Sequence, residues 1–243
     1  MGVLNSFFKY AWNGVFNITG IDISFNIEYR DFSFYMVELK ADYYVLKKRF
    51  EPIGLIPVET FPNQTTLQIN SLEMRKIQFI EPYHEMSIHV PVKSLEEGKY
   101  DPLYHLHLPV TSEEARWGGV DVNGFPKTIA TINIMRGEEV TECKLSNDEG
   151  FVLGYSVKNN TGSLDELTWN LYGVRNNEIL RTSFEIRGNI GESVDIDDSR
   201  VIFGDQSMSK DLEALLVSNK IEKIVIGDQL SGILKKPVFI KKL

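Results

Sequence analysis

The chain has 243 residues, of which 42% are apolar and 25% are charged, and this ordinary globular composition excludes wholesale disorder and collagen-like structure. Its formal net charge of −8 argues against a nucleic-acid-binding surface and against electrostatic docking on an anionic membrane. A chain of this length can bury a hydrophobic core without disulfides or a structural metal.

The only cysteine, Cys143, has no partner for an internal disulfide, which is typical of a reducing compartment. We therefore expect a cytoplasmic protein. No stretch reaches the roughly 18 apolar residues of a membrane-spanning helix. Apolar residues between Phe7 and Phe16 are interrupted by Lys9, which predicts an ordered N-terminal arm or short helix rather than a signal peptide.

Short segments rich in β-branched and aromatic residues, separated by glycine, proline and asparagine, predict strands along most of the chain. The predicted strands are 34–39, 65–69, 85–90, 104–108, 128–134, 150–157, 167–175, 179–186 and 221–226. Because no long helices alternate with them, the pattern favours antiparallel pairing.

Two helices are predicted beside these strands. Asp42 can cap a helix that continues to Phe50, and Ser209 or Asp211 can cap a second helix whose leucines at helical spacing continue to Leu216. No shift in composition marks a domain boundary. The sequence therefore predicts one domain, 1–243, of the mainly β (α+β) class, with peripheral helices and an antiparallel sheet wholly or partly closed into a barrel.

Several common catalytic motifs are absent from the sequence. It has no glycine-rich phosphate loop, no Cys-x-x-Cys pair and no Gly-x-Ser-x-Gly elbow, so nucleotide-dependent chemistry and zinc-ribbon structure have no support.

The histidines form a first candidate site, since all four fall between His84 and His107. His105 and His107 on one strand would share a face, because side chains alternate with period two. With Glu85 or Glu113 nearby, the imidazoles would suit zinc, iron or copper. Exposed or hydrogen-bonded histidines on a half-solvated strand explain the same pattern and are the commoner case.

A second candidate is the segment Gly124-Phe125-Pro126-Lys127, which leads into a predicted strand without other charges. Proline fixes its own φ and restricts its predecessor, so the approach to the strand is stiff. Lys127 is then either a surface lysine with its ammonium in water or a desolvated amine. A desolvated lysine amine is nucleophilic near neutral pH, because burial disfavours the ammonium form.

Four motifs follow one another in the middle of the chain: Tyr83-His84-Glu85, Val90-Pro91-Val92, Gly98-Lys99-Tyr100 and Gly124-Phe125-Pro126-Lys127. In order and spacing they resemble the signature of the acetoacetate decarboxylase family, and a weaker likeness covers most of the chain. The resemblance implies a cone-like antiparallel β-barrel around an active site, in a homo-oligomer.

The resemblance also implies that Lys127 forms a Schiff base with a keto acid and that Glu85 moves protons. No cofactor is then needed, because the iminium nitrogen accepts the electron pair. The expected activity is that of a carbon–carbon lyase that decarboxylates a β-keto acid such as acetoacetate. Tyr83 and Phe125 are expected to contact the substrate.

The sequence departs from the family pattern where charge is expected. Thr128 replaces a second lysine, and Gly119-Val120-Asp121 stands where the family has Gly-Arg-Glu. Phe32 aligns with an expected arginine. Because a guanidinium is the natural partner of a carboxylate, Arg30 and Arg116 are the substitutes we expect to bind the substrate.

Three other functions stay open on the sequence alone. The same lysine can run aldol or dehydration chemistry on another keto acid. His105 and His107 can instead hold a metal. A barrel that has lost the chemistry can act as a binding module, because fold does not determine function.

Overall fold

The computed structural model describes residues 16–18, 21–23, 26–159, 163–193, 196 and 199–243. The expected N-terminal arm or helix from Phe7 lies outside the described residues, apart from Phe16, which begins a strand. This strand, β1 (Phe16–Ile18), pairs with β2 (Ile21–Ile23).

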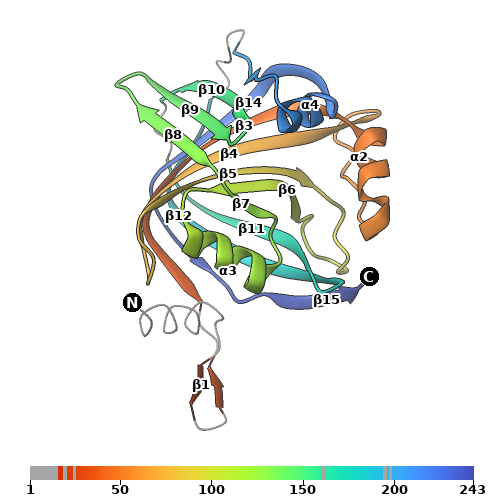
Figure 1. Cartoon of the computed structure of the whole chain (residues 1–243), viewed down its shortest axis with the longest axis vertical. Coiled ribbons are helices and arrows are strands. Elements are labelled where there is room, and N and C mark those ends of the chain that lie inside the picture. The colour runs from red at the N-terminus through yellow and green to blue at the C-terminus, as the bar shows by residue number, and fades with distance from the viewer. Residues whose placement is uncertain (1–15, 19–20, 24–25, 160–162, 194–195, 197–198) are drawn as a thin grey trace.

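A curved sheet of nine strands dominates the described part of the chain (Figure 1). Its order is β11-β12-β14-β3-β4-β5-β6-β7, with β15 paired to β12. The strands are β3 (Ile27–Asp42), β4 (Gln64–Ile77), β5 (Tyr83–Pro91), β6 (Leu103–Val110), β7 (Lys127–Ile129), β11 (Ser163–Arg175), β12 (Glu178–Ser193), β14 (Leu216–Leu234) and β15 (Val238–Lys242).

The sheet is mainly antiparallel but mixed, so the prediction of a wholly antiparallel sheet is wrong at β6. Strand β7 runs parallel to β6, and β11 also pairs in parallel with β6 through Leu103 and Tyr104. Parallel neighbours need a crossover connection, usually a helix. Here α3 (Glu113–Asn123), which the sequence analysis did not predict, carries the chain from β6 back to the start of β7.

A second sheet of four described strands has the order β13-β10-β9-β8. Its strands are β8 (Thr131–Arg136), β9 (Val140–Asn147), β10 (Gly150–Lys158) and β13 (Ile202–Phe203). The predicted strand 128–134 is therefore divided at Ala130, because its two halves belong to different sheets.

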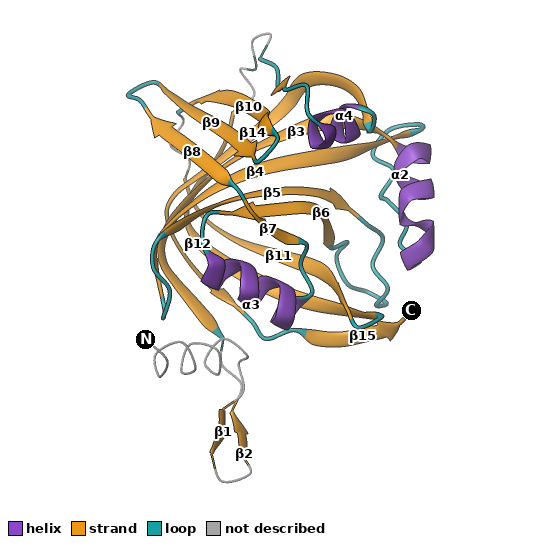
Figure 2. Cartoon of the chain, viewed as in Figure 1, coloured by secondary structure: helices purple, strands orange, loops and turns teal. Residues whose placement is uncertain are grey.

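The two helices predicted from the sequence are present, and Figure 2 shows them at one end of the sheets. Helix α2 (Tyr43–Phe50) is capped by Asp42 as predicted, and the 3₁₀ turn η1 (Glu51–Ile53) follows it. Helix α4 (Ser207–Glu213) begins earlier than predicted and is capped by Gln206. None of the helices in the described residues is long and apolar enough to cross a membrane.

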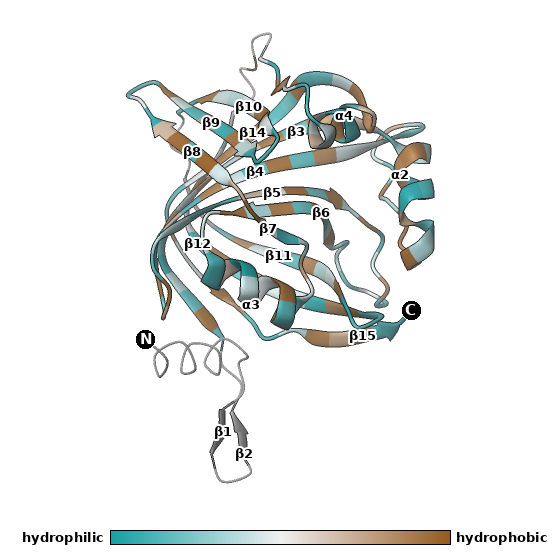
Figure 3. Ribbon diagram, in the orientation of Figure 1, coloured by the Kyte–Doolittle hydropathy of each residue, from teal (hydrophilic) through white to brown (hydrophobic). Residues whose placement is uncertain are grey.

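Apolar side chains cover both faces of the central strands. Tyr35 and Val37 of β3 pack into a cluster shared with the second sheet, whereas Phe34 and Met36 face a second cluster on the inner side. Figure 3 shows apolar and polar bands along the strands, since the apolar side chains of the two clusters are interspersed with polar ones. The inner side contains the candidate site.

Candidate functional site

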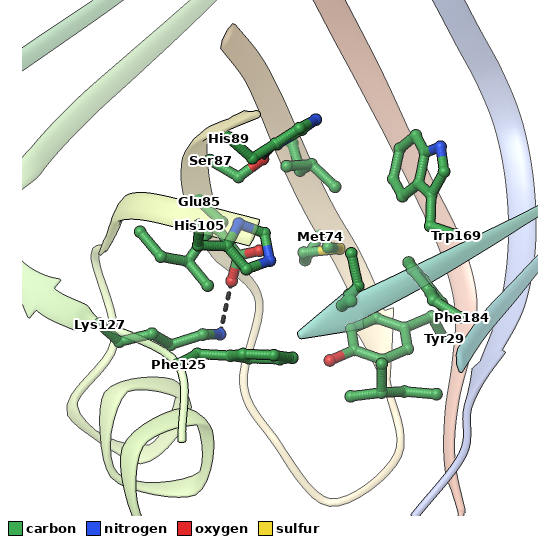
Figure 4. A pocket seen from close by; sticks show the side chains of 14 residues that line it. Tyr29, Met74, Glu85, Ser87, His89, His105, Phe125, Lys127, Trp169 and Phe184 are labelled. Carbon is green, nitrogen blue, oxygen red and sulfur yellow. Dashed lines mark hydrogen bonds and ion pairs between the residues drawn. The ribbon is translucent and has the colours of Figure 1, made fainter. Parts of the chain in front are cut away.

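A cavity of about 40 Å³ lies on the inner side of the nine-stranded sheet. Its polar lining consists of Glu85, Ser87, His89, His105 and Lys127. Its apolar lining consists of Tyr29, Leu72, Met74, Leu108, Phe125, Trp169, Leu171, Phe184 and Leu234. The polar groups converge from β5, β6 and β7, while an aromatic wall comes from strands on the far side (Figure 4).

Strand β5 supplies three of the polar groups because they alternate along it. Glu85, Ser87 and His89 are two residues apart and point to the same face of the strand. The intervening Met86 and Ile88 belong to the opposite apolar cluster.

Lys127 is positioned by the turn that leads into β7. Gly124 ends α3 in the left-handed region at φ 69°, and an added Cβ there would lie 2.7 Å from the Val174 carbonyl carbon. The Lys127 amide then donates to the Phe125 carbonyl at 2.8 Å across Pro126. This tight turn aims the lysine side chain at β5.

The Lys127 amine forms a buried contact with the Glu85 carboxylate. Nζ lies 2.5 Å from Oε2, and the two side chains are only 7% and 12% exposed. The buried Tyr83 ring lies below, with its centroid 5.7 Å from Nζ. Burial raises the pKa of the Tyr83 phenol well above its usual range, and Tyr29 and Glu85 add to the shift, so this phenol stays protonated. Of the two aromatic residues expected to contact the substrate, Phe125 lines the cavity, whereas Tyr83 lies beside Lys127 and is not among the lining residues.

Helix α3 approaches the Lys127 side chain through a glycine. A Cβ added to Gly119 would lie 2.3 Å from Cδ and 2.6 Å from Cε of Lys127. The aliphatic stem of the lysine therefore occupies space that any other residue at position 119 would fill. The sequence analysis noted Gly119 only as part of a departure from the family pattern.

The two histidines expected to share a face are separated by a change in register. Ile88 pairs with His107 while His89 pairs with His105, so β6 carries one extra residue at this point. His105 therefore lines the cavity opposite His89, whereas His107 approaches Asp211, with 3.6 Å between Nε2 and Oδ2. The prediction that His105 and His107 form one face is wrong, because an added residue reverses the alternation.

The metal hypothesis required His105 and His107 on one face, and the change in register separates them. Within the residues that the structure describes, no group of three histidine, cysteine, aspartate or glutamate side chains could hold a metal ion. Glu113 forms an ion pair with Arg116 on α3 instead, at 2.7 Å.

A hydrogen-bonded row across three strands fixes the His89 ring. Gln68 donates from Nε2 to Glu38 at 2.8 Å, so its Oε1 faces Nε2 of His89 at 2.7 Å. An amide oxygen only accepts, so Nε2 of His89 carries the proton and Nδ1 accepts from the Ser87 hydroxyl at 2.9 Å. Burial lowers the pKa of His89 to about 3, which keeps the ring neutral.

The two arginines expected to bind substrate do not line the cavity. Arg30 is beside the inward-facing Tyr29 on β3, so alternation sends its side chain to the outer face, where it pairs with Glu28 at 3.1 Å. Arg116 is 40% exposed on α3. The structure thus brings Lys127, Glu85 and Phe125 together at the cavity, with Tyr83 beneath, and leaves Arg30 and Arg116 outside it.

Comparison with known proteins relates this arrangement to one family. The family model of acetoacetate decarboxylase (ADC) matches residues 39–179, more than half of the chain. No protein of curated function matches the sequence.

Solved structures share the fold at low sequence identity. The crystal structure of acetoacetate decarboxylase from Legionella pneumophila has a TM-score of 0.67 at 11% identity, covering 95% of this chain and 95% of that chain. The enduracididine biosynthesis enzyme MppR complexed with pyruvate has a TM-score of 0.63 at 15% identity, covering 89% and 91%. An acetoacetate decarboxylase-like enzyme from Sphingomonas wittichii RW1 has a TM-score of 0.55 at 10% identity, covering 90% and 94%.

Proposed function

The chain belongs to the acetoacetate decarboxylase family, and we propose that it is a lyase that forms a Schiff base between Lys127 and a small keto acid. The observation that carries the proposal is the buried 2.5 Å contact between Lys127 Nζ and Glu85 Oε2 in a mostly apolar cavity. The structure of MppR, which has a similar fold, contains pyruvate, itself a small keto acid, and this supports the substrate class.

The Lys127–Glu85 pair can supply both a nucleophile and an acid. Moving the shared proton from the amine to the carboxylate yields a neutral amine beside a carboxylic acid, the two forms that the first step of this chemistry requires. The amine attacks the keto carbon, and Glu85 then protonates the departing hydroxyl so that water leaves. The product is a protonated iminium next to a Glu85 carboxylate.

Decarboxylation follows from the charge on the iminium nitrogen. In a β-keto acid, the bond to the carboxylate carbon breaks, CO₂ leaves, and the electron pair moves toward nitrogen to form a neutral enamine. The enamine carbon takes up one proton from solvent through Glu85, and water releases the ketone and the free amine. An apolar cavity favours this step, because the carboxylate charge spreads in the transition state.

The lining residues leave a second reaction type open beside decarboxylation. Among the described residues that line the cavity, Lys127 is the only one that carries a positive side chain, and Glu85 already contacts it. A carboxylate there has no guanidinium partner. Aldol or dehydration chemistry through the same lysine, which needs no departing carboxylate, is therefore the alternative to test beside decarboxylation.

Reduction with sodium borohydride in the presence of acetoacetate or pyruvate tests the proposal. We expect a covalent mass increment on the wild-type chain, with CO₂ release from acetoacetate, and no increment on Lys127→Ala. Lys144→Ala is the matched control, since it removes an exposed lysine that also contacts a glutamate, Glu142, at 2.8 Å. An increment that survives in Lys127→Ala, or none on the wild type with either acid, contradicts the proposal. An increment without CO₂ release favours the aldol or dehydration alternative.

A further inference from the structure

His105 is a buried polar side chain without a protein partner. The residue is only 4% exposed, and neither Nδ1 nor Nε2 has a hydrogen-bond partner among the described residues. Leaving a buried donor and acceptor unpaired is costly, so such groups in a folded protein call for a specific explanation. Of the described side chains with buried unpartnered atoms, His105 alone lines the cavity.

The neighbours of His105 hold the ring but cannot satisfy its nitrogens. Phe125 packs edge to face against it with centroids 5.1 Å apart, and His89 does so at 5.5 Å. His89 has no free nitrogen to offer, because Gln68 and Ser87 engage both. The two nitrogens of His105 are thus left to the cavity, beside the Lys127–Glu85 pair (Figure 4).

We infer that His105 binds the carboxylate of the substrate while Lys127 holds its keto carbon. The imidazole N–H donates a hydrogen bond to one carboxylate oxygen of a β-keto acid. The inference rests on the proposed function for the role of Lys127. It places the substrate carboxylate against β6, and the remaining carbons then face the aromatic wall of Trp169 and Phe184.

A neutral donor suits this position better than a cation. Burial lowers the pKa of His105 well below its usual range, and His89 and the Lys127 charge add to the shift, so the ring is uncharged near neutral pH. One neutral hydrogen bond orients the carboxylate without neutralising its charge. The carboxylate stays destabilised relative to a transition state in which its charge moves to the iminium. The His105 contact also explains how the cavity could bind a carboxylate although its described lining contains no arginine.

Two ligands separate the His105 contact from Schiff-base chemistry. 3-Hydroxybutyrate carries the carboxylate but no ketone, so it binds without forming an iminium. Butanone carries a ketone but no carboxylate, so it forms an iminium without needing His105. Binding is followed by calorimetry, and iminium formation by borohydride trapping.

His105→Phe keeps a planar ring and removes both nitrogens, and His105→Asn returns one donor. We expect His105→Phe to weaken 3-hydroxybutyrate binding and to raise KM for acetoacetate about tenfold each, which is the usual effect of losing one hydrogen bond. Trapping with butanone is expected to be unchanged, and His105→Asn to recover part of the loss. His107→Phe is the matched control, because His107 lies outside the cavity beside Asp211.

Each outcome bears on one hypothesis. Equal binding of 3-hydroxybutyrate by the wild type and a folded His105→Phe variant overturns the role of His105, even where trapping at Lys127 succeeds. An equal loss of butanone trapping in His105→Phe also overturns the role of His105, because a general disturbance of the cavity then explains the effect. If His105→Phe weakens the binding of 3-hydroxybutyrate and no carbonyl compound is trapped on the wild type, the role of His105 is supported and the Schiff base is rejected.

Discussion

Replacing Gly119 by alanine is the sharpest test of how α3 positions the lysine. The added Cβ would lie 2.3 Å from Cδ of Lys127, whereas ordinary contact begins at about 3.4 Å, so the stem must move by about 1 Å. The Nζ–Oε2 contact of 2.5 Å cannot survive such a displacement unchanged. Because a 1 Å misplacement of a reacting group costs roughly a hundredfold in rate, we expect kcat/KM to fall about a hundredfold.

The fold itself is expected to tolerate this substitution. Gly119 lies inside α3 without a positive φ, and alanine is favoured over glycine in a helix interior by about 1 kcal/mol. The assay combines kcat/KM, the rate of borohydride trapping and a thermal melt. Asp121→Ala, an exposed change on the same helix, is the control. A Gly119→Ala variant that retains kcat/KM within threefold of the wild type refutes the claim that α3 sets the position of Lys127.

Three further predictions concern stability and reactivity away from the cavity. Asp42→Ala removes a cap that accepts from two backbone amides of α2, so the free energy of unfolding in urea should fall by about 1 kcal/mol. Burial raises the pKa of Cys143 to about 11, so a disulfide reagent at pH 8 should label this thiol only after the chain is unfolded. The hydrogen bond from Arg75 lowers the pKa of Asp31, and hydrogen bonds from Ser33 and Arg136 lower that of Asp228 despite burial. Because both pKa values are lower in the folded chain than the unfolded value of 3.8, the two carboxylates stabilise the fold above that pH. The free energy of unfolding in urea should therefore decrease as the pH falls below about 4. This decrease should be less steep in Arg75→Gln.

Local sequence patterns predicted most strands because their physical causes are local. The β-branched and aromatic segments at 34–39, 65–69 and 85–90 lie inside β3, β4 and β5. Asp42 caps α2 as expected, since its side chain reaches amides only two and three residues ahead. Helix α3 was missed because its glycines and weak apolar periodicity resemble a loop, and with it the parallel pairing of β6 and β7.

The candidate site was only partly predictable, because part of it depends on how distant strands pair rather than on local sequence. Lys127 and Glu85 came from the motif resemblance, whereas the sequence analysis did not predict Ser87 and His89 at the site, although they follow Glu85 at period two on β5. His105 was assigned to the wrong partner, because the register of β6 against β5 depends on a bulge that no local signal marks. Trp169 and Phe184 arrive from strands far along the chain, so only the assembled sheet places them at the cavity.

The threonine that follows Lys127 bears on whether a second lysine is needed for this chemistry. Thr128 is exposed and is the next residue of β7, so alternation turns its side chain away from the cavity that Lys127 enters. A lysine there would keep its ammonium in water, and two charges separated by roughly 10 Å of water interact by only about 0.4 kcal/mol. Thr128→Lys should therefore change the rate of borohydride trapping by no more than about twofold at physiological salt. An increase of tenfold or more would mean that the cation reaches the amine, and burial alone would then not account for the nucleophilic role proposed for Lys127.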